Sequence, residues 1–272
     1  MAMNTYFAAF ILAAIVLAEE FGSSASEDSK HSDSCLDGIG DLVADTTYDN
    51  PDCKNDFYAH PVDFWFQISD LHNKLRATLQ YGDEQNESES EANKFPKSSD
   101  MSYLRYNCTL EEEAFNISRM CLNTSDPNFL YVGSNNATIS SSEDVNIKLI
   151  FNASIADNSI LHGDDYVRFY DILEQKVQEW WDTSKIFSPL VNLTPTAENK
   201  PMIPFLQMAN ANMTSLGCAY SLCDPCGSPF VSFVCRYGGE LINIGKPIYT
   251  KGNPCDTCRE SCDDYKLCKR TI

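Results

Sequence analysis

The stretch Ile203–Cys223, which reads IPFLQMANANMTSLGCAYSLC, carries the most information about the fold of this chain. It contains no carboxylate, no histidine and no basic residue, although the chain as a whole has a formal net charge of −19. Its parts FLQM and LGCAYSL are apolar enough to pack into a domain, and the second is a plausible strand. We therefore predict structural roles for Phe205, Met208 and Leu216. Asn212 is predicted to lie in an exposed turn between the two parts.

The sequence around this stretch predicts helices first and strands afterwards. FVSFVCRYGG, Phe230–Gly239, alternates well enough to pair with LGCAYSL, and KPIYTKG after it is predicted to be a short extended piece. Upstream, apolar residues recur at three- and four-residue spacing, which predicts helices at 60–82, at 101–121 with Asp100 as cap, and at 164–185. The polar segments between these helices are predicted to be loops. This order indicates an α+β fold.

The N-terminus has the pattern of a secretory signal peptide. Residues 1–18 form an uncharged apolar run that is too short for a comfortable membrane span, and Val16 and Ala18 suit signal peptidase. We predict cleavage near Ala18 and a polar, acidic extension over residues 19–60, with an uncleaved anchor as the alternative. No later segment has about 18 consecutive apolar residues. We therefore expect an extracellular, secreted protein without a stable membrane anchor.

The chain contains twelve cysteines, which in an exported protein indicate disulfides, because the secretory compartment oxidises paired thiols. The motifs CDPC and CDTC leave zinc binding or thiol exchange as alternatives. Their flanking sequence predicts neither the reduced thiolates of a zinc site nor the strand and helix of a redox motif. We therefore predict that all the cysteines are bridged. They are Cys35, Cys53, Cys108, Cys121, Cys218, Cys223, Cys226, Cys235, Cys255, Cys258, Cys262 and Cys268.

Sequons of the form N-x-S/T without a central proline predict a coat of glycan. They begin at Asn86, Asn107, Asn116, Asn123, Asn136, Asn152, Asn192 and Asn212. Asn107 is the weakest of these acceptors, because Cys108 occupies its middle position and can be sequestered in a bridge.

The charge balance restricts the partners of this chain. A net charge of −19 repels phosphate backbones and anionic headgroups, so nucleic acid and acidic membranes are poor partners. The ordinary interpretation of such a surface is solubility in an extracellular fluid, and a dedicated cationic ligand is the alternative.

Six motifs occur in the order that proteins of the CAP superfamily show. They are LHNKLR, MSYLRYNCTLEEEAFNISRMC, the WW of Trp180 and Trp181, FLQMANANMTSLGCAYSLC, FVCRYGG and GKPIYTKGNPCDTC. The chain therefore resembles the secreted SCP/TAPS, venom-allergen-like group, and most of all the activation-associated secreted proteins of parasitic nematodes. The resemblance covers about Pro61 to Cys262. It implies a CAP-type α-β-α sandwich at 61–250, followed by a disulfide-rich, hinge-like tail at 251–272.

The cleft of this family usually holds two histidines and two glutamates, which can bind a divalent metal ion. By the resemblance, Pro204 stands where a histidine precedes F-x-Q-[ML], and Ser134 stands for the glutamate of G-E-N. Thr183 follows the WW pair at the place of the second glutamate, and Asn123 or Thr124 replaces the second histidine. We therefore expect no metal, no cofactor and no catalytic residue in this cleft.

The histidines of the chain do not restore such a site. His31 and His60 lie in the extension, and His72 lies in the helix motif LHNKLR, where a packed or capping imidazole is the expected role. His162 begins the sequence HGDD, which offers a metal ligand set or an acid–base pair. The structural alternative is that two aspartates at the start of a helix are expected for the helix dipole alone.

Functions of three classes are compatible with these observations. The first is a non-catalytic binding protein that acts on a host cell-surface or extracellular protein; the hookworm neutrophil inhibitory factor, an integrin-binding member of the family, is similar in size and sequon density. The second is a lipid carrier, because some relatives hold sterols or fatty acids, although core packing is the alternative for the aromatic residues that would line its groove. The third is a hydrolase, whose base and metal would have to come from unrecognised residues. The groove-lining candidates are Phe64, Trp65, Phe66, Phe169 and Tyr170.

Overall fold

The computed structural model describes residues 62–81, 95–121, 133–140, 164–186, 190–223 and 229–270. The chain divides into two compact units, Met1–Gly40 and Asp41–Ile272, and all described residues lie in the second unit. The predicted signal peptide and the acidic extension therefore lie outside the described residues.

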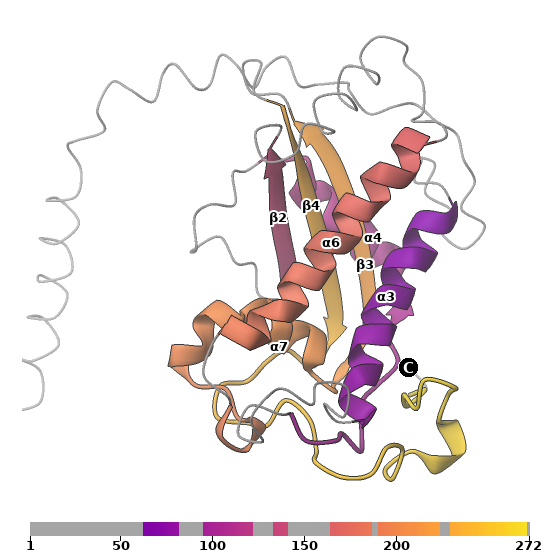
Figure 1. Cartoon of the computed structure of the whole chain (residues 1–272), viewed down its shortest axis with the longest axis vertical. Helices are drawn as coiled ribbons and strands as arrows, with labels where there is room; N and C mark the ends of the chain where they lie inside the picture. Colours follow the sequence, from indigo (N-terminus) through magenta and orange to yellow (C-terminus); the bar gives the residue numbers. More distant parts are fainter. Residues whose placement is uncertain are drawn as a thin grey trace, which may run out of the picture. The chain divides into compact units, whose positions relative to one another are not determined.

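A sheet of four strands forms the middle of the domain (Figure 1). The strands are β1 (Arg105–Tyr106), β2 (Ser134–Ser140), β3 (Met213–Cys223) and β4 (Phe230–Gly239), in the spatial order β1-β3-β4-β2. β4 pairs antiparallel with both β2 and β3, whereas β1 runs parallel to β3. The two central strands are the two that the sequence predicts, and they are apolar because both of their faces are covered.

Helices cover both faces of this sheet. α3 (Val62–Tyr81), α6 (Asp164–Ile186) and α7 (Ile203–Ala209) lie on one face, and α4 (Cys108–Ser118) lies on the other (Figure 1). Short 3-10 helices complete the chain at η3 (Val191–Leu193), η4 (Ala197–Met202) and η6 (Arg259–Ser261). The predicted α-β-α sandwich is confirmed.

The side chains of β4 show which core belongs to which face. Phe233 stacks on Trp180 of α6 with ring centroids 5.3 Å apart, within the larger core on the face of α3 and α6. Val234, the next residue, packs instead with Ala114 and Phe115 of α4 in a separate small core. This alternation is the period-two pattern that a strand buried on both faces must have.

The stretch Ile203–Cys223 divides into two elements. Its first part, which includes FLQM, is the helix α7, and its second part is the strand β3. Phe205, Met208 and Leu216 are at most 1% exposed, so their predicted structural role is confirmed. Asn212 lies in the predicted turn, but its side chain is half-buried rather than exposed.

Three local predictions are wrong. The second helix begins at Cys108 and not after Asp100, because Asn107 caps it through bonds from the backbone N–H groups of Thr109 and Leu110. The polar segment predicted as a loop contains the edge strand β2. KPIYTKG forms bends with one isolated bridge, between Lys251 and Ser98, rather than a strand.

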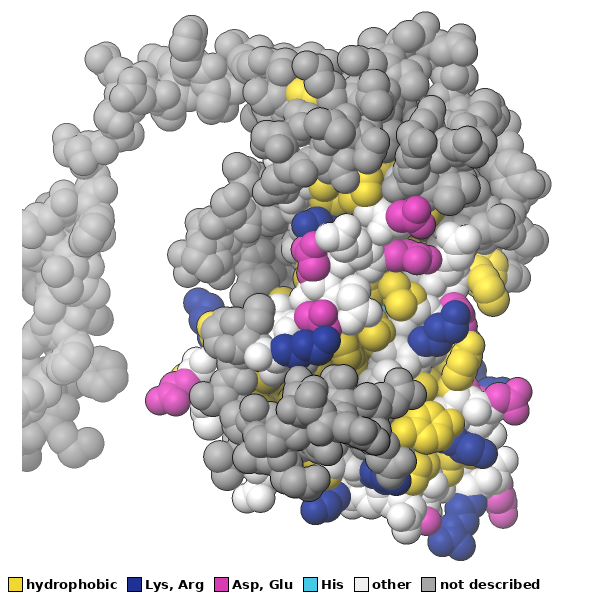
Figure 2. Space-filling view, viewed as in Figure 1, with side chains coloured by type: hydrophobic (Ala, Val, Ile, Leu, Met, Phe, Trp, Pro, Cys, Tyr) yellow, Lys and Arg dark blue, Asp and Glu magenta, His cyan; other side chains and the backbone are white. Residues whose placement is uncertain are grey.

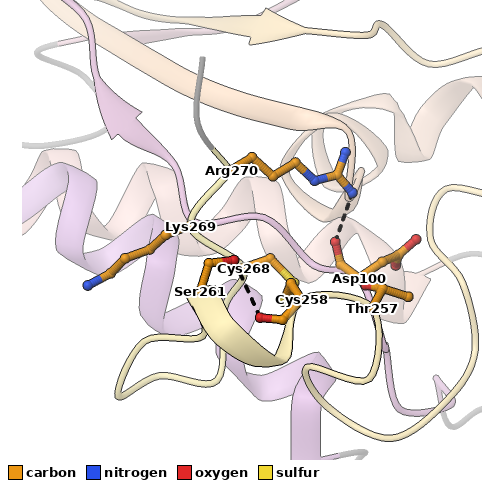
Figure 3. A pocket seen from close by; sticks show the side chains of 7 residues that line it. All are labelled: Asp100, Thr257, Cys258, Ser261, Cys268, Lys269 and Arg270. Carbon is orange, nitrogen blue, oxygen red and sulfur yellow. Dashed lines mark hydrogen bonds between the residues drawn. A yellow bond between two sulfur atoms is a disulfide. The ribbon is translucent and has the colours of Figure 1, made fainter.

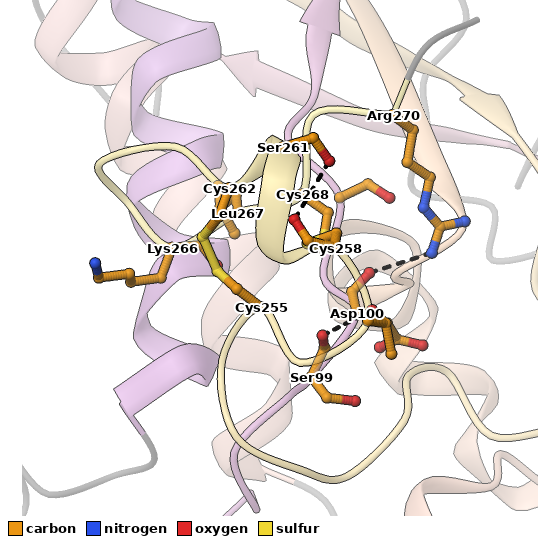
Figure 4. Close-up of a disulfide and its surroundings, with 12 residues drawn as sticks. Ser99, Asp100, Cys255, Cys258, Ser261, Cys262, Lys266, Leu267, Cys268 and Arg270 are labelled. Carbon is orange, nitrogen blue, oxygen red and sulfur yellow. Dashed lines mark hydrogen bonds between the residues drawn. A yellow bond between two sulfur atoms is a disulfide. The ribbon is translucent and has the colours of Figure 1, made fainter.

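Four disulfides lie among the described residues. Cys218–Cys235 joins the central strands, Cys121–Cys223 joins the end of α4 to β3, and Cys255–Cys262 and Cys258–Cys268 close the tail (Figure 4). Cys108 is also disulfide-bonded. In neither C-x-x-C motif do the described cysteines pair within the motif, since Cys223, Cys255 and Cys258 all bond elsewhere. This connectivity supports structural bridges over a redox motif.

The tail is also held by hydrogen bonds to the segment before β1. The backbone N–H of Cys268 donates to the carbonyl of Met101 at 2.8 Å, and the N–H of Tyr103 donates to the carbonyl of Cys268 at 3.0 Å. The tail therefore packs against the same segment that the guanidinium of Arg76 anchors. Arg76, on α3, is fully buried and donates to the carbonyls of Ser102, Met208, Asn210 and Met213.

Candidate functional site

Three of the four residues that we assigned to metal-ligand positions from the resemblance lie where α6, α7 and β2 meet. Thr183 lies in the last turn of α6, Pro204 in the first turn of α7, and Ser134 is the first residue of β2. The hydroxyl of Thr183 accepts a bond from the N–H of Phe205 at 3.4 Å, and the Nδ2 group of Asn135 donates to the carbonyl of Pro204 at 3.1 Å. We call this region the α6–α7–β2 junction. Asn123 lies outside the described residues.

Thr183 serves as a cap for α7. Its hydroxyl donates to the carbonyl of Trp180 at 2.8 Å, which leaves its oxygen to accept from Phe205. The side chain of Met202, the N-cap residue of α7, makes no capping hydrogen bond to this helix. The first N–H groups of a helix lack hydrogen-bond acceptors within the helix. Thr183, on the neighbouring helix α6, supplies an acceptor for one of these N–H groups. Pro204 suits the same turn, where a missing N–H costs nothing.

A buried polar network lies directly behind these positions. Nδ1 of His72 lies 2.7 Å from the carbonyl of Ile68, and Nε2 lies 3.0 Å from the hydroxyl of Tyr237. A carbonyl can only accept, so Nδ1 carries the proton and the Tyr237 hydroxyl donates to Nε2. The hydroxyl oxygen in turn accepts from Nδ2 of Asn135 at 3.1 Å. Gln207 closes the network, because its Nε2 donates to the Asn135 side chain.

The network holds its titratable groups in their neutral forms. Burial lowers the pKa of His72 to about 4, the bond to Ile68 opposes that change, and the charge of Arg76 adds to it. Burial also raises the pKa of Tyr237 well above its ordinary value. Both ring nitrogens of His72 are therefore committed to hydrogen bonds at neutral pH, and the packed imidazole that the sequence predicts is confirmed.

The donor atoms at the junction do not fit a divalent metal ion. Ser134 and Thr183 offer hydroxyls, and Pro204 offers no side-chain donor at all, where imidazole and carboxylates would be needed. The Thr183 oxygen is already used in two hydrogen bonds. In the part of the chain that the structure describes, no group of three or more His, Cys, Asp or Glu side chains is placed to hold a metal ion.

The other predicted site residues are distributed over the surface, the core and the undescribed parts. Asn116 and Asn192 are exposed, whereas Asn107, Asn136 and Asn212 are half-buried. The sequons at Asn86, Asn123 and Asn152 lie outside the described residues, as do His31, His60 and His162 and the side chains of Asp164 and Asp165.

The aromatic residues proposed to line a lipid groove do not share one surface. Phe169 and Tyr170 are at most 4% exposed, and Phe169 meets Tyr220 edge to face, so packing is the correct interpretation for this pair. Phe66 is 58% exposed. Trp65 lies between these extremes, with its ring on that of Tyr106 at 5.6 Å. The side chain of Phe64 lies outside the described residues.

Glu111 is a buried carboxyl that the sequence did not lead us to expect. It is 5% exposed on the sheet-facing side of α4, where it contacts Tyr106 of β1. Burial raises the pKa of Glu111 to about 7, and the hydrogen bond with Tyr106 opposes that rise. The sequence does contain an indication that Glu111 is buried. Glu111 lies three residues after Cys108 and four before Phe115, on the predicted apolar stripe.

None of the described helices has the length and apolar content that crossing a bilayer requires.

Comparison with known proteins identifies the relatives of this chain. Residues 69–237 match the model of the CAP, cysteine-rich secretory protein family. The Ancylostoma secreted protein of Ancylostoma caninum is 36% identical over 90 residues, which are 31% of this chain and 20% of that protein. Hookworm platelet inhibitor 1, from the same organism, is 28% identical over 173 residues, which cover 62% of this chain and 68% of that protein. The similarity to the first relative thus spans only about one fifth of its length.

Solved structures show the same fold. BmVAL-1 superposes with a TM-score of 0.57 at 20% identity, covering 79% of this chain and 97% of that one. The structure of NaASP2 with Zn2+ gives a TM-score of 0.54 at 24% identity, covering 75% of this chain and 94% of that one. The resemblance to nematode members of the family, on which the sequence-based predictions of the fold depended, is confirmed.

Proposed function

This chain belongs to the CAP, cysteine-rich secretory protein family, and we propose that it is a secreted, glycosylated, non-catalytic member that acts by binding a protein on the surface of host cells. The observation that carries the proposal is the α6–α7–β2 junction. The residues that the resemblance assigns to the family's metal-ligand positions there are Ser134, Thr183 and Pro204. The contacts of Thr183 and Pro204 join α7 to α6 and to β2. Members of the family are generally non-catalytic, which agrees with this assignment.

Among the described residues of this junction, a hydrolytic mechanism lacks its reacting groups. A general base needs a free lone pair and a pKa near the working pH. His72 has neither, because both its nitrogens are bonded and burial lowers its pKa to about 4. Thr183 has no base within the hydrogen bonds that it makes, since its partners are backbone groups.

The distribution of sequons favours one face of the domain as the binding surface. Asn107 and Asn116 belong to the cap and body of α4. Asn136 on β2 pairs with Val234, whose side chain packs against α4, so Asn136 points to the same face of the sheet. Glycans at these three positions would cover the α4 face. The described parts of α3 and α6 contain no sequon.

The face of α3 and α6 is suited to a protein partner. It carries hydrophobic side chains between charges of both signs (Figure 2). Phe66, which belongs to α3, is 58% exposed. Lys74 pairs with Asp70 on α3, and Lys176 pairs with Glu179 on α6. Aromatic residues are enriched in protein interfaces, where they carry much of the binding energy, and the rim around them is polar.

The relatives suggest which cells to test. Two of them come from a hookworm, and one is named a platelet inhibitor, so host platelets and leukocytes are the first surfaces to examine. Purified protein from a glycosylating host should bind one of these cell types saturably, as measured by flow cytometry with labelled protein. Absence of saturable binding to both would contradict the proposal.

A glycan introduced on α3 tests the face directly. Gln67 is exposed and precedes Ile68 and Ser69, so Gln67→Asn creates a sequon on the helix. The added glycan should abolish cell binding without lowering the melting temperature. Asn116→Gln, which removes a glycan from α4, is the matched control and should leave binding unchanged. Equal binding by the Gln67→Asn glycoform and the parent would exclude this face.

A lipid carrier is the alternative, and its support is Phe66 together with Trp65, because Phe169 and Tyr170 are enclosed. Extraction of the purified protein and mass spectrometry of the extract test it, since a carrier would retain lipid in a fixed ratio to protein.

A further inference from the structure

A pocket of about 560 Å³ lies where the tail meets the segment before β1 (Figure 3). Its lining is formed by Asp100, Thr257, Cys258, Ser261, Cys268, Lys269 and Arg270. The lining combines a carboxylate, two hydroxyls and a guanidinium with the Cys258–Cys268 disulfide. Donors and acceptors over a small apolar surface are the groups that bind a sugar, because a pyranose ring presents hydroxyls at its edge and C–H groups on its face.

A glycosylation sequon lies at the edge of this pocket. Arg270, which lines the pocket, donates from Nη1 to Oδ1 of Asn212 at 3.2 Å and from Nη2 to the carbonyl of Asp100 at 3.2 Å. Asn212, Met213 and Thr214 form the sequon. The two bonds of Arg270 therefore link the sequon asparagine to the pocket wall.

The contact between Asn212 and Arg270 is compatible with a glycan on Asn212. Transfer joins Nδ2 of asparagine to C1 of the first sugar of a lipid-linked oligosaccharide, while the bond from C1 to the lipid pyrophosphate breaks and Nδ2 loses a proton. Oδ1 remains a carbonyl oxygen in the product and can still accept from Arg270. Among the described residues, no hydrogen bond uses Nδ2 of Asn212, so the geometry leaves this atom to the sugar.

We propose that the N-linked glycan of Asn212 is seated in this pocket, where Arg270 fixes its asparagine and Thr257, Ser261 and Asp100 contact its first sugars. The proposal rests on the secreted, glycosylated state assigned above. Because a sequon must be accessible when its glycan is transferred, the tail packs against the segment before β1 after the transfer. The half-buried position of Asn212 then follows from the folded tail and does not exclude occupancy.

The test compares the release of glycans from the folded, secreted protein by a peptide N-glycosidase, with site-resolved mass spectrometry of the glycopeptides. Asn116 provides the internal reference, since it is exposed on α4. We expect release at Asn212 to be at least about tenfold slower than at Asn116, since it requires local opening of the tail. After reduction and denaturation the two rates should be equal.

Variants locate the seat of the glycan. Arg270→Ala should raise the rate at Asn212 to that at Asn116, whereas Arg259→Ala, which removes an exposed tail guanidinium outside the pocket, should not change it. An unmodified Asn212, equal rates at the two sites in the parent protein, or slow release that persists in Arg270→Ala would each overturn the proposal. If one of these results is found while other sequons carry glycans, only the proposal for Asn212 fails and the proposed function is unaffected. A protein secreted without any glycan would contradict both the proposal for Asn212 and the proposed function.

Discussion

Arg76 and His72 on one face of the sheet and Glu111 on the other are all buried, but their hydrogen bonding differs. On the side of α3, Arg76 and His72 are fully buried, and each makes its hydrogen bonds to backbone carbonyls or to a neutral partner. On the side of α4, Glu111 is almost as deeply buried, but among the described residues its Oε2 atom has no hydrogen-bond partner. A satisfied polar group stabilises a fold, whereas an unsatisfied one costs free energy, so Arg76 and Glu111 should respond differently to mutation.

The largest effect is expected at Arg76. Burial lowers the pKa of Arg76 to about 9, so the side chain stays charged at neutral pH and binds the carbonyls of Ser102, Met208, Asn210 and Met213. Arg76→Met should destabilise the protein by about 3–5 kcal/mol, because those buried carbonyls lose their donor. Chemical denaturation measures the difference.

The matched control for this change lies on the same helix. Lys74 forms a surface ion pair with Asp70, and its side chain is 59% exposed. Lys74→Met should cost less than about 1 kcal/mol. Similar losses for the two variants would show that the carbonyl contacts of Arg76 contribute little.

The ionised carboxyl of Glu111, unlike the charge of Arg76, should destabilise the folded protein, and its effect should depend on pH. Its pKa is raised in the folded state to about 7, so the folded protein prefers the protonated carboxyl. Stability is therefore fully present below about pH 4.5 and falls as the pH rises to about 7. Tyr106, the titratable group that contacts it, stays neutral because burial raises its pKa well above the ordinary value.

Glu111→Gln should remove this dependence. The amide keeps the shape of the carboxyl without its charge, so the variant should be more stable than the parent at pH 8 by at most about 3 kcal/mol and nearly equal at pH 4.5. Melting curves of both proteins across this range decide it. Glu113→Gln, at an exposed carboxylate of the same helix, is the control. A parent curve without a slope between pH 4.5 and 7 would contradict the unsatisfied state of Glu111.

Thr183 should give the smallest effect. Thr183→Val keeps the shape of the side chain and removes the bond to the N–H of Phe205, so it should cost about 1 kcal/mol, as the loss of a helix cap does. Thr78→Val on α3 removes an exposed hydroxyl that bonds only to its own helix, and it should cost less. If the two variants melt alike, Thr183 does not cap α7.

The sequence predicts the helices and strands in which apolar residues recur on the buried side. It misses elements that lack such a spacing of apolar residues. α3, α6 and β4 are found because apolar residues follow their core-facing side. β2 is missed because SNNATIS is polar, as an edge strand can be. Asp100 resembles a helix cap, but its carboxylate instead accepts from the N–H of Thr250, a contact 150 residues away in sequence that no local pattern reveals.

The correspondence of the junction residues to the family's ligand positions stays a prediction from the resemblance. Thr183 and Pro204 are assigned to these positions from their places next to the motifs WW and FLQM. The role of Thr183 as a cap depends on how α6 meets α7, and that geometry is not encoded in either motif. Glu111 is missed because a glutamate in LEEEAF is expected at the surface, although its spacing from Cys108 and Phe115 places it on the apolar stripe, and α4 packs closely against Gly217.

The central claim is that the α6–α7–β2 junction is a structural contact and not a metal site. Elemental analysis of the secreted protein after dialysis tests it most directly. We predict zinc, magnesium and calcium far below one equivalent per chain, with no increase in Pro204→His, because Ser134 and Thr183 supply no carboxylate. An equimolar amount of zinc that survives dialysis of the parent would contradict the claim, and its loss in His162→Ala would locate the site elsewhere in the chain.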